Sequence, residues 1–185
     1  MIRRSISVLC FVAVALILSV LLVVHSEAVV LEAHVEHGDR FNSSLVRATQ
    51  GFIADGGSVP GVYEGRAKTH LVDVRSLVAF GEIACVVLLL VAVVAGASRS
   101  VLYESSVATV SVVLALGVFG GVWFSSFFSL FHQVFFEQGS YVFPSDSLLI
   151  ALFPASFFAD LAFLSSLGSL GIGVSYALAG FLARA

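Results

Sequence analysis

Two histidines, His70 and His132, are the residues in this sequence best suited to moving a proton. Each borders a long apolar segment, with His70 just before one and His132 just after another. A histidine with an ordinary pKa of about 6.5 is mostly neutral at pH 7 and can accept a proton. If both segments cross a membrane as neighbouring helices, the two imidazoles can meet at one surface and act as a general acid and base.

Asp73 follows His70 by three residues, in His70-Leu71-Val72-Asp73-Val74-Arg75. If a helix has begun there, both side chains share one face, and the carboxylate could orient the ring or stabilise its protonated form. The same spacing fits a simple polar first turn, in which Asp73 is favoured near the positive helix end and Arg75 pairs at the interface. The spacing leaves both interpretations open.

His132 lies in an aromatic stretch, and its neighbours include Phe131, Phe135 and Phe136. Twelve of the 17 phenylalanines lie between residues 119 and 163, so this part of the chain is unusually rich in rings. Aromatic residues of this kind commonly face lipid or pack between helices. A single histidine among them could serve only as an interfacial hydrogen-bonding residue, so the aromatic pattern alone does not predict catalysis.

Two further carboxylates are functional candidates. Glu82 lies inside the second apolar segment, where a carboxylate is expensive and must be protonated, paired with another helix or exposed to a polar cavity. Asp146 follows Phe143-Pro144-Ser145, a pattern that predicts a helix start, where a carboxylate in the first turn normally caps the helix.

A group of histidines and glutamates precedes His70 and comprises His25, Glu32, His34, Glu36 and His37. Imidazole and carboxylate groups can bind divalent transition metals. The spacing of these residues matches no established ligand pattern, however, so the sequence predicts no metal site.

The composition is that of a membrane protein with several spans. Of 185 residues, 59% are hydrophobic and only 11% are charged, which a soluble domain rarely shows. The formal net charge is -3 and the basic residues are scattered. The chain therefore has no basic face for nucleic acid, and we exclude nucleic-acid binding.

Four apolar segments are long enough to cross a bilayer as helices. We predict these transmembrane helices at residues 1–24, 73–98, 104–131 and 157–183. Pro154 interrupts the apolar stretch before the last one. We therefore assign residues 132–156 to an extracytoplasmic or interfacial segment.

Residues 25–72 form the one long polar region. Short alternating stretches within it, such as residues 29–35, suggest strands rather than a helix. The predicted fold is thus an all-α membrane bundle of four transmembrane helices with a small extracytoplasmic β-rich cap.

Charges near the ends of the predicted spans favour cytoplasmic termini. The basic residues on that side are Arg3, Arg4, Arg99 and Arg184. The polar region 25–72 also holds arginines, but a long loop has little influence on orientation. In this orientation all five histidines lie outside the cytoplasm, and so would an active site built from them.

The two histidine stretches together resemble the bacterial lipoprotein intramolecular transacylase (Lit) family. The first, His70 to Leu77, is similar to the family's His-x-x-Asp-Val element. The second is Phe131-His132-Gln133-Val134-Phe135-Phe136, and it continues through Phe143, Asp146, Leu149-Ile150, Phe153-Pro154 and Phe157-Phe158. With the arrangement of four spans, the resemblance covers most of the chain.

This resemblance implies transfer of the sn-2 acyl chain of a diacylglyceryl-modified lipoprotein cysteine to the α-amino group of that cysteine, which gives a lyso-form lipoprotein. Amine and ester belong to one substrate residue, so proximity favours the reaction without an enzyme nucleophile. The protein must supply a base for an amine of pKa about 7.7 to 8.0 and donors for the oxyanion.

Under this resemblance we expect His132 to be the general base, His70 to stabilise the oxyanion and Asp73 to orient His70, although the two histidine roles could be exchanged. Substrate contacts are expected from Arg75, Glu82, Phe135, Phe136 and Asp146. No metal or organic cofactor is expected.

The expected partners are diacylated lipoproteins and membrane phospholipid, and the expected state is a monomer in the bacterial cytoplasmic membrane. Two other classes stay open from the sequence. One is a non-catalytic membrane subunit that binds lipid or lipoprotein. The other is a divalent-cation permease that uses Glu82 and the histidine and glutamate group.

Overall fold

The computed structural model describes residues 1–37 and 42–183. These residues form seven α-helices and no strand. The helices are α1 (Ile2–His25), α2 (Glu27–His37), α3 (Ser43–Asp55), α4 (Gly65–Ala95), α5 (Arg99–Phe135), α6 (Leu148–Leu152) and α7 (Ala155–Leu182).

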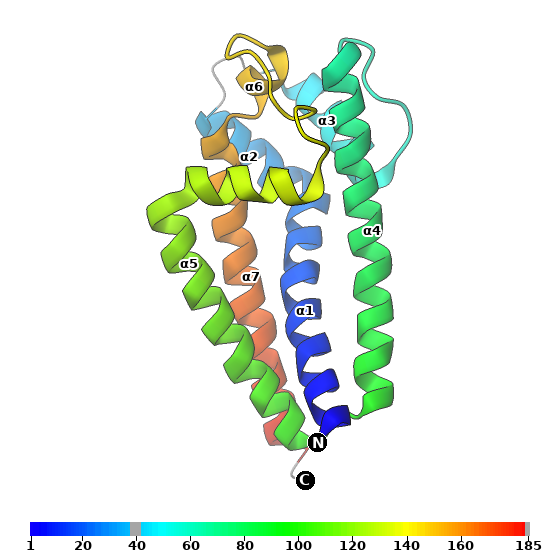
Figure 1. The fold of residues 1–185 in the computed structure, drawn as a ribbon, viewed down its shortest axis with the longest axis vertical. Helices are drawn as coiled ribbons and strands as arrows, with labels where there is room; N and C mark the ends of the chain where they lie inside the picture. The colour runs from blue at the N-terminus through cyan, green and yellow to red at the C-terminus, as the bar shows by residue number, and fades with distance from the viewer. Residues whose placement is uncertain (38–41, 184–185) are drawn as a thin grey trace.

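Four of these helices, α1, α4, α5 and α7, are long and apolar enough to cross a membrane. Helix α1 lies at the centre and packs against the other three (Figure 1). The start of α1 and the end of α7 lie at one end of the bundle, and the short helices gather at the other end (Figure 1). Arg184, one of the residues that favour cytoplasmic termini, lies outside the described residues.

Small and hydroxylated residues line the contacts of α1. The Ser7 hydroxyl lies 2.9 Å from the carbonyl oxygen of Ala92 and 2.7 Å from that of Gly96. Farther along α1, the hydroxyls of Ser19 and Ser169 are 2.6 Å apart. In lipid, apolar surface alone gives helices no reason to associate, so close packing and such hydrogen bonds must hold the bundle together.

Helix α5 bends sharply at Trp123, whose φ of -127° and ψ of 40° are not helical. Before the bend the helix runs along the bundle, and after it the helix lies across the bundle in front of α7 and α1 (Figure 1). The bend falls inside the segment 104–131, which the sequence presents as one span. Because of this bend, the last turns of α5 extend toward α4.

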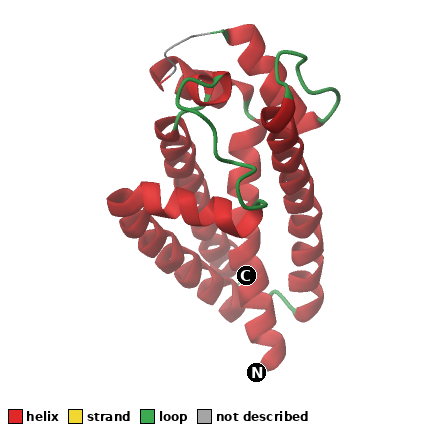
Figure 2. Ribbon diagram, turned by 45° about the horizontal axis from the view of Figure 1, so that its top comes forward, coloured by secondary structure: helices red, strands yellow, loops and turns green. Residues whose placement is uncertain are grey.

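The prediction of a β-rich cap is wrong, because the cap is helical (Figure 2). Helices α2, α3 and α6 pack with the first turns of α4 and α7 around one apolar core. Its buried members are Val30, Ala33, Val46, Phe52, Tyr63, Leu71, Leu149, Leu152 and Phe157.

The alternation at residues 29–35 is misleading because it also fits a helix. The residues buried there are Val30, Ala33 and His34, which have the i, i+3, i+4 spacing of a helix face. In α3 the buried residues likewise include Val46 and Thr49. Packing of these faces outweighs the preference of valine for strands.

Gly168 and Gly171 of α7 allow a test of the packing between α1 and α7. A Cβ atom at Gly168 would lie 3.1 Å from the Cβ of Ser19, whereas at Gly171 it would meet nothing within 4 Å. Alanine has a higher helix propensity than glycine by about 1 kcal/mol at either site. The difference between the two alanine variants therefore isolates the crowding against α1.

We expect Gly168→Ala to unfold at a lower temperature than Gly171→Ala in detergent. Overpacking typically costs about 1–3 kcal/mol, and each kcal/mol shifts the midpoint by about 2–4 °C in a chain of this size. Thermal unfolding of the two purified variants measures the difference. Equal midpoints would mean that the described contact between α1 and α7 does not limit stability.

Candidate active site

His70 and His132 lie face to face, although their helices are far apart along most of their length. Their ring centres are 5.9 Å apart and the ring planes differ by 25°. His70 lies in the second turn of α4, and His132 lies in the last turn of α5. The bend at Trp123 makes this meeting possible, because it carries the end of α5 across the bundle.

Aromatic rings surround the two imidazoles. Phe136 contacts both, with ring centres 4.8 Å from His70 and 5.3 Å from His132. Phe143 lies against His70 at 5.5 Å, and Phe128 lies against His132 at 4.3 Å. The pair is therefore in an apolar environment, where charge interactions are stronger than in water.

The imidazole of His132 is oriented by its own helix. Its Nδ1 lies 2.7 Å from the carbonyl oxygen of Phe128. A carbonyl can only accept a hydrogen bond, so Nδ1 must carry the proton. In the neutral ring the lone pair is then on Nε2, which leaves this nitrogen able to accept a proton from another group.

His70 is buried, with 7% of its surface exposed, and its Nδ1 makes no hydrogen bond within the described part of the chain. A buried N–H without an acceptor is rarer in proteins than an acceptor that lacks a donor. The tautomer with its proton on Nε2 is therefore favoured for this ring. The two histidines thus have opposite tautomers, with Nδ1–H on His132 and Nε2–H on His70.

Asp73 lies on the same helix as His70 and is half-buried. Within the described residues no hydrogen bond joins the two side chains, because Nδ1 of His70 is unpaired. The carboxylate is near enough to act on the imidazole through its charge. The arrangement fits electrostatic support of His70 better than direct orientation of its ring.

The predicted aromatic and acidic contacts differ in position. Phe136 is 9% exposed and touches both histidines, whereas Phe135 is 52% exposed and packs on Phe131 at 4.9 Å. Asp146 is exposed in the turn before α6. The residue that caps α6 is Ser147, whose hydroxyl oxygen accepts from the Ile150 amide at 3.3 Å.

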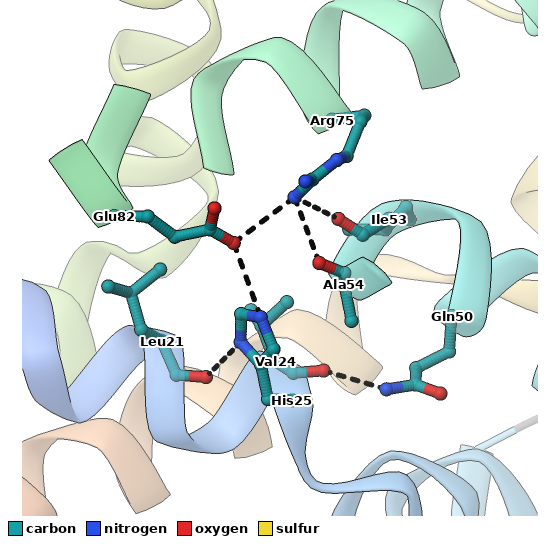
Figure 3. A network of polar contacts seen from close by, with 8 residues as sticks. All are labelled: Leu21, Val24, His25, Gln50, Ile53, Ala54, Arg75 and Glu82. Carbon is teal, nitrogen blue, oxygen red and sulfur yellow. Dashed lines mark hydrogen bonds and ion pairs between the residues drawn. The ribbon is translucent and has the colours of Figure 1, made fainter. Parts of the chain in front are cut away.

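Arg75 and Glu82 belong to a separate polar network (Figure 3). Nη1 of Arg75 donates to the carbonyl oxygens of Ile53 at 3.1 Å and Ala54 at 2.9 Å, and it lies 3.1 Å from Oε1 of Glu82. These carbonyls belong to the last turn of α3, which has no donors of its own. Arg75 therefore fixes the end of α3 to α4.

The network continues to the end of α1 through His25 (Figure 3). Nε2 of His25 lies 3.3 Å from Oε1 of Glu82, and Nδ1 lies 2.8 Å from the carbonyl oxygen of Leu21. Gln50 adds a bond from its Nε2 to the carbonyl oxygen of Val24 at 3.0 Å. Together these contacts hold α4, which carries His70, against the ends of α1 and α3.

Within the described ranges, no group of three or more histidine, cysteine, aspartate or glutamate side chains is placed to hold a metal ion. His25 is instead engaged with Glu82. The structure does not describe the side chain of His37.

Sequence reasoning missed two contributors to this site. The carbonyl of Phe128 orients His132, and the only signal for it is the four-residue spacing within a helix. Tyr141, whose ring centre is 5.2 Å from that of His132, lies in the loop after α5. A glycine two residues earlier, Gly139, marks a tight turn that brings Tyr141 back toward the helix.

The network yields a stability prediction for Arg75. We expect Arg75→Met to lower stability by about 1–3 kcal/mol, because it leaves partly buried carbonyls and Glu82 without their donor. Arg47→Met is the matched control: Arg47 pairs with Glu27 at 3.0 Å, but both side chains are more than half exposed, and such pairs contribute about 0–1 kcal/mol. Thermal unfolding measures both variants. An equal decrease in unfolding temperature for Arg75→Met and Arg47→Met would contradict this role of Arg75.

Comparisons with known proteins agree with this architecture. Solved structures of the same fold include the membrane integral lipoprotein intramolecular transacylase Lit from Bacillus cereus, with 18% identity, a TM-score of 0.81, and coverage of 99% of this chain and 95% of that one. A single-substitution variant of that protein has 16% identity and a TM-score of 0.76, with coverage of 99% and 91%. A comparison with curated protein sequences gives no match.

At such low identity these structures show only that the fold is shared. The family model adds a similarity in sequence. The model described as lipoprotein intramolecular transacylase Lit matches residues 58–158, which include both histidines, Asp73 and the aromatic stretch. This range is more than half of the chain, and it confirms the resemblance inferred from the two histidine stretches. The chain therefore belongs to the lipoprotein intramolecular transacylase family.

Proposed function

We propose that His132 and His70 carry out the acyl transfer of a lipoprotein intramolecular transacylase, with His132 as the base and His70 as the oxyanion donor. Family membership gives the general activity: the protein is an integral membrane acyltransferase that acts on lipoproteins. The observation that carries the residue assignment is the close pair of imidazoles, of which His132 has its Nδ1 against the carbonyl oxygen of Phe128.

The proposed reaction moves one acyl chain within a single substrate residue. The α-amino nitrogen of the diacylglyceryl cysteine attacks the carbonyl carbon of the sn-2 ester, and a tetrahedral oxyanion forms. The bond from that carbon to the sn-2 glycerol oxygen then breaks. One proton leaves the nitrogen and one reaches the glycerol oxygen, so the product is an amide and a free hydroxyl, and no water is consumed.

His132 is the better candidate for the base because its Nε2 carries the lone pair. The hydrogen bond from Nδ1 to the Phe128 carbonyl, 2.7 Å long, also stabilises the imidazolium that forms when Nε2 takes the proton of the amine. The same Nε2 can then give this proton to the departing glycerol oxygen. General acid–base catalysis of this kind typically contributes about 10²–10⁴-fold in rate.

His70 suits the oxyanion because it can donate through Nε2. Its burial beside Phe136 and Phe143 keeps water away, and a donor in such a site acts more strongly than in water. The carboxylate of Asp73 acts on the His70 ring through its charge alone. Arg75 and Glu82 contribute indirectly, because they hold α4 in place.

The aromatic stretch is a suitable surface for the acyl chains. Phe128 contacts Phe158 of α7 at 5.2 Å, and Phe131 and Phe135 extend the apolar surface outward. We propose that acyl chains lie along these rings in contact with membrane phospholipid, under the helical cap. The site would then face the extracytoplasmic side, both termini would be cytoplasmic, and a monomer would suffice.

Substitution by glutamine separates the two proposed roles. A glutamine amide can donate a hydrogen bond from about the position of Nε2, but it cannot act as a base. We expect His132→Gln to lose about 10²–10⁴-fold in kcat, whereas His70→Gln keeps most of the activity that His70→Ala loses. Mass spectrometry of the N-terminal lipopeptide, after incubation with diacylated lipoprotein, measures conversion to the lyso form.

Thr69→Ala is the control, because Thr69 is exposed and, within the described residues, its hydroxyl bonds only to the Gly65 carbonyl oxygen of its own helix. It should leave the rate unchanged, and all variants should unfold at temperatures close to the parent protein. If His70→Gln is as inactive as His132→Gln, the oxyanion role of His70 is wrong. If His70→Ala and His132→Gln both retain full activity, the assignment of the pair to catalysis fails.

A further inference from the structure

A polar pocket opens beside His132, where α5 ends and the following loop begins. It has a volume of about 370 Å³ and is lined by Gln133, Gln138 and Tyr141. The ring of Tyr141 also lies 5.2 Å from that of His132. The pocket is therefore next to the imidazole that would accept the proton of the cysteine α-amine.

The loop that forms this pocket is held in a defined shape. The amide of Ser140 donates to the carbonyl oxygen of Glu137 at 3.0 Å, in a tight turn in which Gly139 has a φ of 86°. At the other side of the loop, Nη1 of Arg66 donates to the carbonyl oxygen of Val142 at 2.9 Å. The turn and this bond to α4 fix Gln138 and Tyr141 relative to the two histidines.

The lining residues have the hydrogen-bonding chemistry of a peptide group. A glutamine side chain is a primary amide that both donates and accepts, and a tyrosine hydroxyl does the same. No charged residue in the described part of the chain lines the pocket, so a phosphate or an acidic headgroup would find no cation from that part there. The hydroxyl of Ser140, in the same turn, is buried without a hydrogen-bond partner in the described structure.

The pocket and the aromatic stretch suit different parts of the lipoprotein substrate. The acyl chains require apolar surface, which the phenylalanines supply. The polypeptide of a lipoprotein continues from the carbonyl of the same cysteine whose amine is next to His132, and it must leave toward polar surroundings. At about 3.3–3.6 Å per extended residue, a pocket adjoining His132 can receive the first two or three residues after the cysteine.

We infer that this pocket binds the peptide backbone immediately after the lipidated cysteine, through hydrogen bonds with Gln133, Gln138 and Tyr141. The inference rests on the proposed function. Hydrogen bonds between these side-chain amides and the amides of the substrate depend on the substrate's backbone and not on its side chains. The enzyme would thus accept lipoproteins of different sequence and would prefer lipidated polypeptide over free lipid of similar shape.

The test compares two synthetic substrates of the detergent-solubilised full chain. One is diacylglyceryl-cysteine N-methylamide, which ends at the cysteine, and the other carries three further residues. The variant is Gln133→Leu with Gln138→Leu, which keeps similar size and removes the amides. Glu137→Gln is the control, because this residue lies in the same turn but does not line the pocket.

We expect the parent protein and Glu137→Gln to have a KM for the extended substrate about tenfold or more below that for the short one, since a few hydrogen bonds of ordinary strength give such a factor. The double leucine variant should lose this preference. Its kcat should be unchanged for both substrates, and its KM should be unchanged for the short one. An extended substrate with N-methylated backbone amides should behave as the short one does.

The outcomes separate this inference from the proposed function. If the double variant keeps the preference of the parent for the extended substrate, the pocket does not bind peptide, although the transacylase activity stands. If the parent converts both substrates with equal KM, the inference is also overturned. If the parent converts neither, the proposed function fails, and the inference fails with it.

Discussion

The close contact of two imidazoles depends on a break in one helix. His70 and His132 belong to helices that lie on opposite sides of α1 and α7 (Figure 1), and two straight helices in these positions could not bring the rings to 5.9 Å. The non-helical conformation of Trp123 turns the end of α5 across the bundle. The aromatic contacts of His132, the loop after Phe136 and the polar pocket all follow from that turn.

The histidine pair lies between two different kinds of support. On the side of α5, rings pack on His132, and a carbonyl of the same helix sets its tautomer. On the side of α4, the support is polar: Arg75 and Glu82 bind the ends of α1 and α3. An apolar site can hold its imidazoles in place only if the helices behind them are fixed, and charged groups away from the reacting atoms meet this need without placing their charge in the site.

Sequence reasoning reached the membrane class, the four apolar helices and the meeting of His70 and His132, because long apolar runs and rare titratable residues are strong signals. It failed on the cap, since residues 29–35 satisfy both a strand and a helix pattern and only packing of Val30 and Ala33 decides between them. It did not locate the bend, although the glycine pair Gly120-Gly121 lies two residues before Trp123 and is a common site for a break in a helix. The carbonyl partners of Arg75 could not be predicted either, since Ile53 and Ala54 belong to another helix and backbone carbonyls leave no signal in the sequence.

The central position of α1 has a consequence for the order of assembly. This helix precedes the other three spans in the chain, and each of them packs on it, so each one meets a partner that is already in the membrane. The last span, α7, supplies Phe157 to the core of the cap and Phe158 to the rings next to His132. The last span therefore completes the proposed site, which cannot form until α7 has packed on the helices before it.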